Sequence, residues 1–219
     1  MTYRLFIDSA HAGDWKIGLG RGWLHGVTTN PLIISRAGKK VYMPTAAQLV
    51  ADAREACIAE LQLQVTWHSA PELLANGRAL RNLWHCVTVK VPATGIGFEA
   101  AAALCREGVP VTITACYTAH QTMLAASIGA QYVAPYYGRM LDAGIDADAR
   151  LDAMLSIGNR RNLRVLVASI RSIDQLETLT ARGFDTFTVT PALAAEMGRD
   201  AQSEGAATDF MRAADESLK

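Results

Sequence analysis

Short apolar stretches alternate with helical stretches eight times along the chain, and this alternation restricts the possible folds more than any other feature. The apolar stretches are rich in β-branched residues, as is typical of buried parallel strands. Strands that alternate with helices favour parallel βα units. The predicted strands are residues 3–7, 23–27, 61–66, 86–92, 109–114, 131–135, 164–168 and 185–189.

Apolar residues at helical spacing fill the intervals between these strands. Asn30 and Thr45 are expected to cap helices, and Gly108 is expected to end one. The stretch around Gly138 and Gly144 is predicted as a loop. The predicted helices are residues 11–18, 45–57, 69–81, 98–106, 117–128, 148–157, 173–182 and 208–218, with short helices that open at Pro31 and Pro191.

Eight such units predict an α/β fold, a single closed (β/α)8 barrel over residues 1–219. The segment 208–218 is an additional C-terminal helix with apolar residues on one side. An open doubly wound sheet is the competing fold. That fold commonly carries a glycine-rich phosphate loop after an early strand, and the sequence contains none.

Composition excludes several classes of protein. The formal net charge is zero and the basic residues form no cluster, so nucleic-acid binding has no electrostatic support. The first residues lack the apolar run of a signal peptide, and no apolar stretch approaches the length of a membrane span. The 4 cysteines and 5 histidines are scattered, so we expect no metal site and a reduced, cytoplasmic compartment.

One lysine stands out because it interrupts an apolar strand. Lys90 lies within residues 86–92, between valines on both sides. Burial favours the neutral amine, and a neutral amine is a nucleophile that forms Schiff bases with carbonyl carbons. The alternative is a lysine at a strand end whose amine extends to solvent.

Polar residues follow the apolar part of most predicted strands, where a barrel builds its active site. They include a nucleophile, a carboxylate, amides and hydroxyls, and this complementarity indicates a site, although many strands simply end in polar residues. They are Asp8, Thr28, Asn30, Gln64, Lys90, Thr114, Tyr136 and Ser169. Arg139 and Arg171 follow the sixth and seventh strands. With Ser169 they would suit a phosphate group, since guanidinium binds such oxyanions in a bidentate manner; otherwise they are surface charges.

Five stretches together resemble the transaldolase family of class I aldolases. They are 6–8 (FID), 26–31 (GVTTNP), 89–92 (VKVP), 134–139 (APYYGR) and 168–171 (ASIR), and they span almost the whole chain. The resemblance implies a (β/α)8 barrel. The length is similar to that of the short bacterial branch, which contains small transaldolases and fructose-6-phosphate aldolases.

The resemblance also implies roles for individual residues. Lys90 occupies the position of the lysine that forms an imine with a ketose donor. Asp8, Asn30 and Ser169 match residues that contact the donor. Arg139, Ser169 and Arg171 match the phosphate site, where arginine at 171 is similar to the transaldolases.

The residues that hold the catalytic water distinguish the two activities. Transaldolases have glutamate, threonine and phenylalanine at these positions, whereas fructose-6-phosphate aldolases have glutamine, threonine and tyrosine. This chain has Gln64, Thr114 and Tyr136. The resemblance therefore implies a cofactor-independent, metal-free class I aldolase that cleaves fructose 6-phosphate to dihydroxyacetone and glyceraldehyde 3-phosphate.

Three other functions stay open. The chain could be a transaldolase with unusual water-binding residues, a relative acting on another phosphorylated or sulfonated ketose, or a non-catalytic barrel that binds sugar phosphates. The resemblance also implies a homo-oligomer, a pentamer or decamer, that contacts neighbouring copies through the C-terminal helix. The apolar side of 208–218 would equally suit packing on its own barrel.

Overall fold

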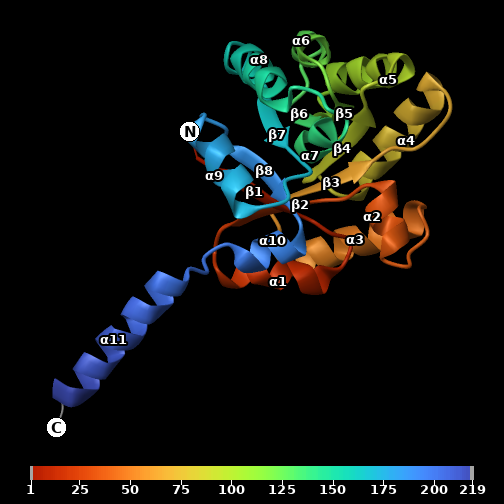
Figure 1. The fold of residues 1–219 in the computed structure, drawn as a ribbon. Coiled ribbons are helices and arrows are strands. Elements are labelled where there is room, and N and C mark those ends of the chain that lie inside the picture. Colours follow the sequence, from red (N-terminus) through yellow and green to blue (C-terminus); the bar gives the residue numbers. More distant parts are fainter. Residues whose placement is uncertain (1, 218–219) are drawn as a thin grey trace.

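Eight parallel strands close into a barrel in the computed structural model, which describes residues 2–217 (Figure 1). Each strand pairs with the next along the chain, and the eighth pairs with the first. This closure confirms the predicted barrel and excludes the open doubly wound sheet. The strands are β1 (Arg4–Asp8), β2 (Leu24–Thr28), β3 (Glu60–Gln64), β4 (Val87–Pro92), β5 (Val111–Cys116), β6 (Tyr132–Pro135), β7 (Arg164–Val167) and β8 (Thr186–Val189).

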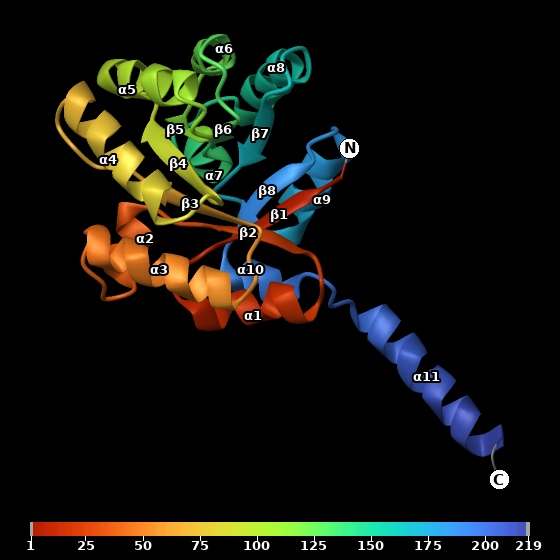
Figure 2. The ribbon, with the colours of Figure 1, turned by 180° about the vertical axis from the view of Figure 1, so that it is seen from behind.

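Helices surround the barrel, as the views from the two sides show (Figures 1 and 2). The main apolar core lies between the outward faces of the strands and these helices. The helices are α1 (Ala12–Gly20), α2 (Pro31–Arg36), α3 (Met43–Glu55), α4 (Ala70–Leu83), α5 (Gly95–Arg106), α6 (Ala119–Ser127), α7 (Tyr137–Asp142), α8 (Ala147–Asn159), α9 (Ile173–Ala181), α10 (Pro191–Glu196) and α11 (Ala201–Ser217). Across residues 2–217, none of them combines the length and apolar character needed to cross a membrane.

Two predicted capping features are confirmed and one is wrong. The Asn30 side chain accepts a hydrogen bond from the Ile33 amide at 3.0 Å, and so caps α2. Gly108 follows the end of α5 with φ of +75°, which suits glycine. Thr45 does not cap α3, because the helix begins two residues earlier, at Met43. Thr45 is buried inside its first turns.

The stretch around Gly138 is a helix, α7, rather than the predicted loop. Its glycine does not mark a turn. A Cβ atom at residue 138 would lie 2.4 Å from the Ser169 carbonyl oxygen. Glycine is therefore present because the loop after β7 packs directly against this helix, a contact that sequence spacing does not show.

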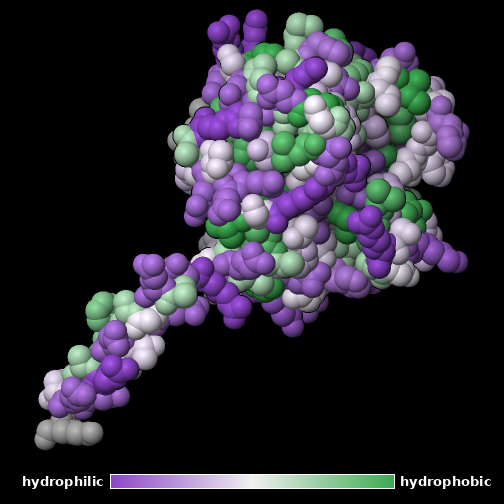
Figure 3. Space-filling model, viewed as in Figure 1, coloured by the Kyte–Doolittle hydropathy of each residue, from purple (hydrophilic) through white to green (hydrophobic). Residues whose placement is uncertain are grey.

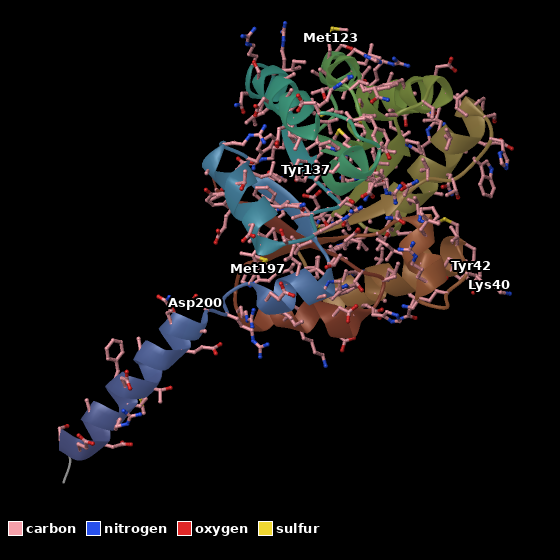
Figure 4. The ribbon with its side chains drawn as sticks, in the orientation of Figure 1. Lys40, Tyr42, Met123, Tyr137, Met197 and Asp200 are labelled. Carbon is pink, nitrogen blue, oxygen red and sulfur yellow. The ribbon has the colours of Figure 1, made fainter. Side chains whose placement is uncertain are left out.

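The C-terminal helix α11 projects away from the barrel (Figures 1 and 2). It begins at Ala201 rather than at the predicted 208, because Asp200 caps it by accepting a hydrogen bond from the Ser203 amide at 2.8 Å. Asp200 lies where the helix departs from the body (Figure 4). None of its described residues is buried, and hydrophobic side chains stand exposed among hydrophilic ones (Figure 3). It does not cover its own barrel; Leu218, part of the predicted segment, lies outside the described residues.

Inside the barrel, a polar network lies closer to the N-terminal ends of the strands than Lys90 does. The buried carboxylate of Glu60 accepts hydrogen bonds from Gln62 Nε2 at 2.9 Å, Thr88 Oγ1 at 2.8 Å and Tyr132 Oη at 2.7 Å. His25 Nε2 lies 3.3 Å from the same carboxylate. The sequence analysis missed this network, although the alternation in residues 60–64 (ELQLQ) was a signal that one face of β3 meets polar surroundings.

Candidate active site

Lys90 lies inside the barrel, on β4, and its exposed fraction is 3%. Its register partners are Gln64 on β3 and Thr112 on β5, so these three residues face the same side of the sheet. The burial excludes the alternative of an amine that extends to solvent. Burial lowers the pKa of the Lys90 amine, and the negative charge of Asp8 acts in the opposite direction.

Asp8, at the end of β1, is the carboxylate that acts on Lys90. Burial raises the pKa of Asp8, while Lys90, a hydrogen bond from Thr28 and Arg139 each act to lower it. Thr28 Oγ1 donates to Asp8 Oδ1 at 2.7 Å, and the same hydroxyl lies 2.6 Å from Thr188 Oγ1 on β8. Burial thus shifts the pKa of the amine and the pKa of the carboxyl group toward each other, which favours the neutral form of both.

Gln64 is the register partner of Lys90 on β3, Thr114 lies on β5 two residues beyond the partner Thr112, and Tyr136 directly follows β6. Thr114 Oγ1 and Tyr136 Oη are 3.2 Å apart and form a hydrogen bond. Burial raises the pKa of Tyr136, whereas the Thr114 hydrogen bond and Arg139 oppose the shift. The buried Gln64 Oε1 accepts no hydrogen bond from any described residue. A buried acceptor of this kind is suited to a water molecule or a substrate hydroxyl.

Ser169 lies against the start of α7, the helix that carries Arg139, because backbone hydrogen bonds join the loop after β7 to this helix. The amide of Tyr137 donates to the Ala168 carbonyl at 2.9 Å, and the amide of Gly138 donates to the Ser169 carbonyl at 3.0 Å. Ser169 has φ of +64°, a left-handed conformation that is costly for a residue other than glycine. Strain of this kind is concentrated at functional sites, where the surrounding structure imposes it.

The two arginines of this region have different partners. The Arg139 guanidinium lies over the Tyr136 ring, 4.5 Å from its centroid. Its positive charge acts to lower the pKa of Asp8. Arg171 instead forms a bidentate ion pair with Asp142, the last residue of α7. The structure therefore brings Arg139 to the mouth of the barrel and shows Arg171 nearby but held by a carboxylate.

Asn30 lies at the carboxyl end of β2, next to Thr28, but part of its side chain is already in use. Its carbonyl oxygen caps α2, so only the amide NH₂ group is left to donate to a ligand. Asn30 can therefore donate to a ligand through its NH₂ group, and its carbonyl oxygen keeps one further lone pair.

Sequence reasoning missed three features near the site. Thr188 contacts Thr28, and its signal was the alternation of threonine with apolar residues in β8. Asp142 gave no local signal, because its partner is distant in sequence. Trp67 is 55% exposed and lines a cavity of about 280 Å³ with Gln64 and Tyr42, which lies on the connection between α2 and α3 (Figure 4).

Comparison with known proteins gives a consistent family. The family model described as Transaldolase/Fructose-6-phosphate aldolase matches residues 5–219. A probable transaldolase of Maricaulis maris is 31% identical over 192 residues, which cover 87% of this chain and 86% of the relative. A probable transaldolase of Dehalococcoides mccartyi is 34% identical over 170 residues, which cover 77% of each chain.

Among solved structures, a mandelate oxidase variant with a monooxide FMN adduct superposes with a TM-score of 0.60. The match covers 89% of this chain and 67% of that chain, at 16% sequence identity. At this identity the similarity shows the barrel fold alone.

Proposed function

Because the chain belongs to the transaldolase/fructose-6-phosphate aldolase family, we propose that it is a class I aldolase that cleaves and forms fructose 6-phosphate through an imine on Lys90. The observation that carries this proposal is the buried amine of Lys90, beside an unpartnered amide oxygen of Gln64 and the hydrogen-bonded pair Thr114–Tyr136. A non-catalytic sugar-phosphate-binding barrel would have no need of this costly arrangement.

The first half of the proposed cycle breaks the carbon–carbon bond. The neutral Lys90 amine attacks C2 of the ketose, and loss of water gives the protonated imine. This cation accepts the electron pair of the C3–C4 bond, while the C4 hydroxyl proton goes to Asp8, whose raised pKa suits a proton acceptor. Glyceraldehyde 3-phosphate leaves, and an enamine stays on Lys90.

The second half returns the free enzyme. A water molecule held by Gln64, Thr114 and Tyr136 relays the proton held by Asp8 to C3 of the enamine, which returns Asp8 to its carboxylate form. Hydrolysis of the resulting imine then releases dihydroxyacetone and regenerates the amine. Gln64 only orients this water, because an amide does not act as a base, so Tyr136 is the main proton-handling group.

The remaining residues bind the substrate. Thr28 orients the Asp8 carboxylate through their 2.7 Å hydrogen bond, and the NH₂ group of Asn30 donates to a hydroxyl of the donor. Arg139, Ser169 and Arg171 bind the distal phosphate. The bound partners are therefore a sugar phosphate and dihydroxyacetone.

Transaldolase activity is the second candidate, and the names of the relatives favour it. Product analysis with fructose 6-phosphate alone separates the two. An aldolase releases dihydroxyacetone without an acceptor, whereas a transaldolase depends on an acceptor such as erythrose 4-phosphate. Turnover that begins only with a different phosphorylated or sulfonated ketose would identify a substrate-shifted relative.

Borohydride reduction in the presence of the donor tests the imine itself. The expected result is one covalent adduct on the peptide that contains Lys90, and no adduct in Lys90→Ala. Lys39→Ala is a matched control, because this partly exposed lysine already donates to the backbone carbonyl of Ala10 at 2.8 Å. An adduct on another lysine, or none, would contradict the proposed role of Lys90 and favour a non-catalytic binding barrel.

A further inference from the structure

The proposed anion site contains two guanidinium groups, but only one of them is free to meet an anion. Arg139 forms no ion pair with any residue in the range 2–217, and its charge acts on Asp8 and Tyr136. Arg171, on the adjacent loop after β7, is neutralised by Asp142. The effective positive charge of the site is therefore closer to one than to two.

The contact between Arg171 and Asp142 uses both ends of each group. Arg171 Nη1 donates to Asp142 Oδ1 at 2.6 Å, and Nη2 donates to Oδ2. This parallel geometry is the same one with which arginine binds a phosphate. Asp142 therefore occupies the two nitrogens that a phosphate would use.

The surroundings hold Arg171 in this position. Its amide donates to Gln175 Oε1 at 2.9 Å, in the first turn of α9. Both Arg171 Nε and the Ser169 hydroxyl pack against Gly138. A Cβ atom at residue 138 would lie 2.8 Å from Arg171 Nε and 3.0 Å from Ser169 Oγ. Arg171 thus remains next to Ser169, within the predicted phosphate site, while its terminal nitrogens face Asp142.

We infer that Asp142 is a specificity-determining residue that lowers the affinity of this site for a phosphate dianion relative to a neutral or singly charged distal group. A dianion must either displace the Asp142 carboxylate or bind beside it, and like charges repel. The side chains of Arg171 and Asp142 are 51% and 57% exposed, so their pair is weak enough to be displaced. The pair therefore disfavours a dianionic distal group relative to a neutral or singly charged one, but it does not prevent a phosphate from binding. This inference rests on the proposed function, because it takes Arg139, Ser169 and Arg171 to be the anion site.

Inorganic phosphate is the probe, and Asp142→Asn is the variant. The amide keeps the shape of the side chain but removes its charge. We expect the dissociation constant for phosphate, measured by titration calorimetry at fixed ionic strength, to fall about five- to tenfold, as removal of a unit charge near a partly solvated dianion predicts. The preference for the phosphorylated over the unphosphorylated ketose, as a ratio of kcat/KM, should rise by a similar factor.

Asp174→Asn is the matched control. Asp174 is an exposed carboxylate three residues from Arg171, and it forms no ion pair in the part of the chain that the structure describes. Its substitution changes the net charge equally, so the expected change in phosphate affinity is less than twofold. Equal effects of the two substitutions would show a general charge effect and overturn the inference.

A double-mutant cycle with Arg171→Gln isolates the pair. In the wild-type background this substitution should weaken phosphate binding only slightly, because Arg171 is already occupied. In the Asp142→Asn background the same substitution should abolish the gain. Weaker or unchanged phosphate binding in Asp142→Asn, or no measurable binding in any variant, would overturn the inference. Phosphate binding needs no turnover, so failure of the imine trap at Lys90 is read independently of this result.

Discussion

Lys90 experiences two opposing effects, because burial lowers its pKa and the charge of Asp8 raises it. Replacement of Asp8 by Asn removes the opposing effect, so the pKa of Lys90 should fall further. The pH dependence of imine formation checks this. Wild type should lose reactivity, as the pH falls, at a point below the ordinary lysine pKa of 10.5, and Asp8→Asn should lose it at a lower pH still.

A higher pKa of Lys90 in Asp8→Asn would contradict the electrostatic coupling of Lys90 to Asp8. Thr28→Val is the companion variant, because it removes the 2.7 Å hydrogen bond to Asp8 but keeps the carboxyl group. That hydrogen bond lowers the pKa of Asp8, so its loss favours the neutral acid. Thr28→Val should therefore lower the pKa of Lys90 by less than Asp8→Asn does.

Tyr136 is the residue whose removal should separate the two candidate activities. Tyr136→Phe removes the phenol that is hydrogen-bonded to Thr114. Cleavage with release of dihydroxyacetone needs protonation of the enamine, whereas transfer to an acceptor aldehyde does not. We expect release to fall by about 100-fold, the usual contribution of a general acid, and transfer to fall far less.

The control is Tyr137→Phe, in the neighbouring residue. Its hydroxyl donates to Asp148 at 3.2 Å, outside the group of residues around Lys90. Both reactions should be nearly unchanged in this variant. Equal losses of release and transfer in Tyr136→Phe would contradict its role in proton transfer.

The contact between α7 and the loop after β7 predicts a strong effect of Gly138→Ala. The added Cβ would lie 2.4 Å from the Ser169 carbonyl oxygen, so the two segments must separate. Overpacking of this kind costs about 1–3 kcal/mol of unfolding free energy, and phosphate binding should weaken because Ser169 and Arg171 move. Urea unfolding and phosphate titration measure the two effects.

Gly13→Ala in α1 is the matched control, since a Cβ there meets no atom within 4 Å. It should raise the unfolding free energy slightly, by about 0.5–1 kcal/mol. A similar small gain in Gly138→Ala would show that the contact is not tight.

The Glu60 network joins several strands, and its charge makes their stability depend on pH. Burial acts to raise the pKa of Glu60, but hydrogen bonds from His25, Tyr132, Thr88 and Gln62 together hold it below its ordinary value of 4.5. A carboxyl group with a lowered pKa stabilises the fold above its unfolded-state pKa, and this contribution is lost as the pH falls through the folded-state value.

Glu60→Gln should therefore lower the unfolding free energy at pH 7 by about 1–3 kcal/mol, because buried donors lose a charged acceptor. The difference from wild type should shrink as the pH falls below 4.5, where the wild-type carboxyl becomes protonated. Urea unfolding across pH measures it, with the exposed Glu99→Gln as control. A difference that is constant with pH would contradict the role of the charge.

The order and type of the elements followed from the sequence because apolar periodicity records which faces are buried. The same reasoning put Lys90 on a buried strand and Asp8, Gln64, Thr114 and Tyr136 at the ends of strands, but it left open the solvent-directed alternative for Lys90 that the structure excludes. Contacts between distant segments did not follow. The helix at Gly138, the Asp142–Arg171 pair and the donors to Glu60 depend on which loops and strands meet in space, and local patterns carry no information on this.

At the scale of the whole molecule, α11 projects away from the barrel, and none of its described residues is buried (Figure 1). Phe210 is 73% exposed and Met211 is 64% exposed, and the side-chain hydrogen bonds of α11 stay within the helix and its first turn. Most helical stability in proteins comes from packing of an apolar face, and none of the described residues of α11 is buried. We therefore expect α11 to pack on a neighbouring copy, as it would in the pentamer or decamer that the family resemblance implies.

Light scattering coupled to size exclusion tests this expectation. Phe210→Asp should shift the wild-type oligomer to smaller species, whereas Glu204→Gln, on the same helix, should leave the mass unchanged. A monomeric wild type at micromolar concentration would contradict the proposed assembly.

The position of Glu60 has a consequence for how the barrel closes. Its donors come from β2, β3, β4 and β6, and each points inward only in one alignment of its strand. A shift of any of these strands by one residue would turn its donor side chain outward. The buried Glu60 carboxylate would then lose a hydrogen bond, which is costly for a buried charge. The Glu60 carboxylate thus stabilises the barrel with the correct strand register relative to barrels in which one of these strands is shifted by one residue.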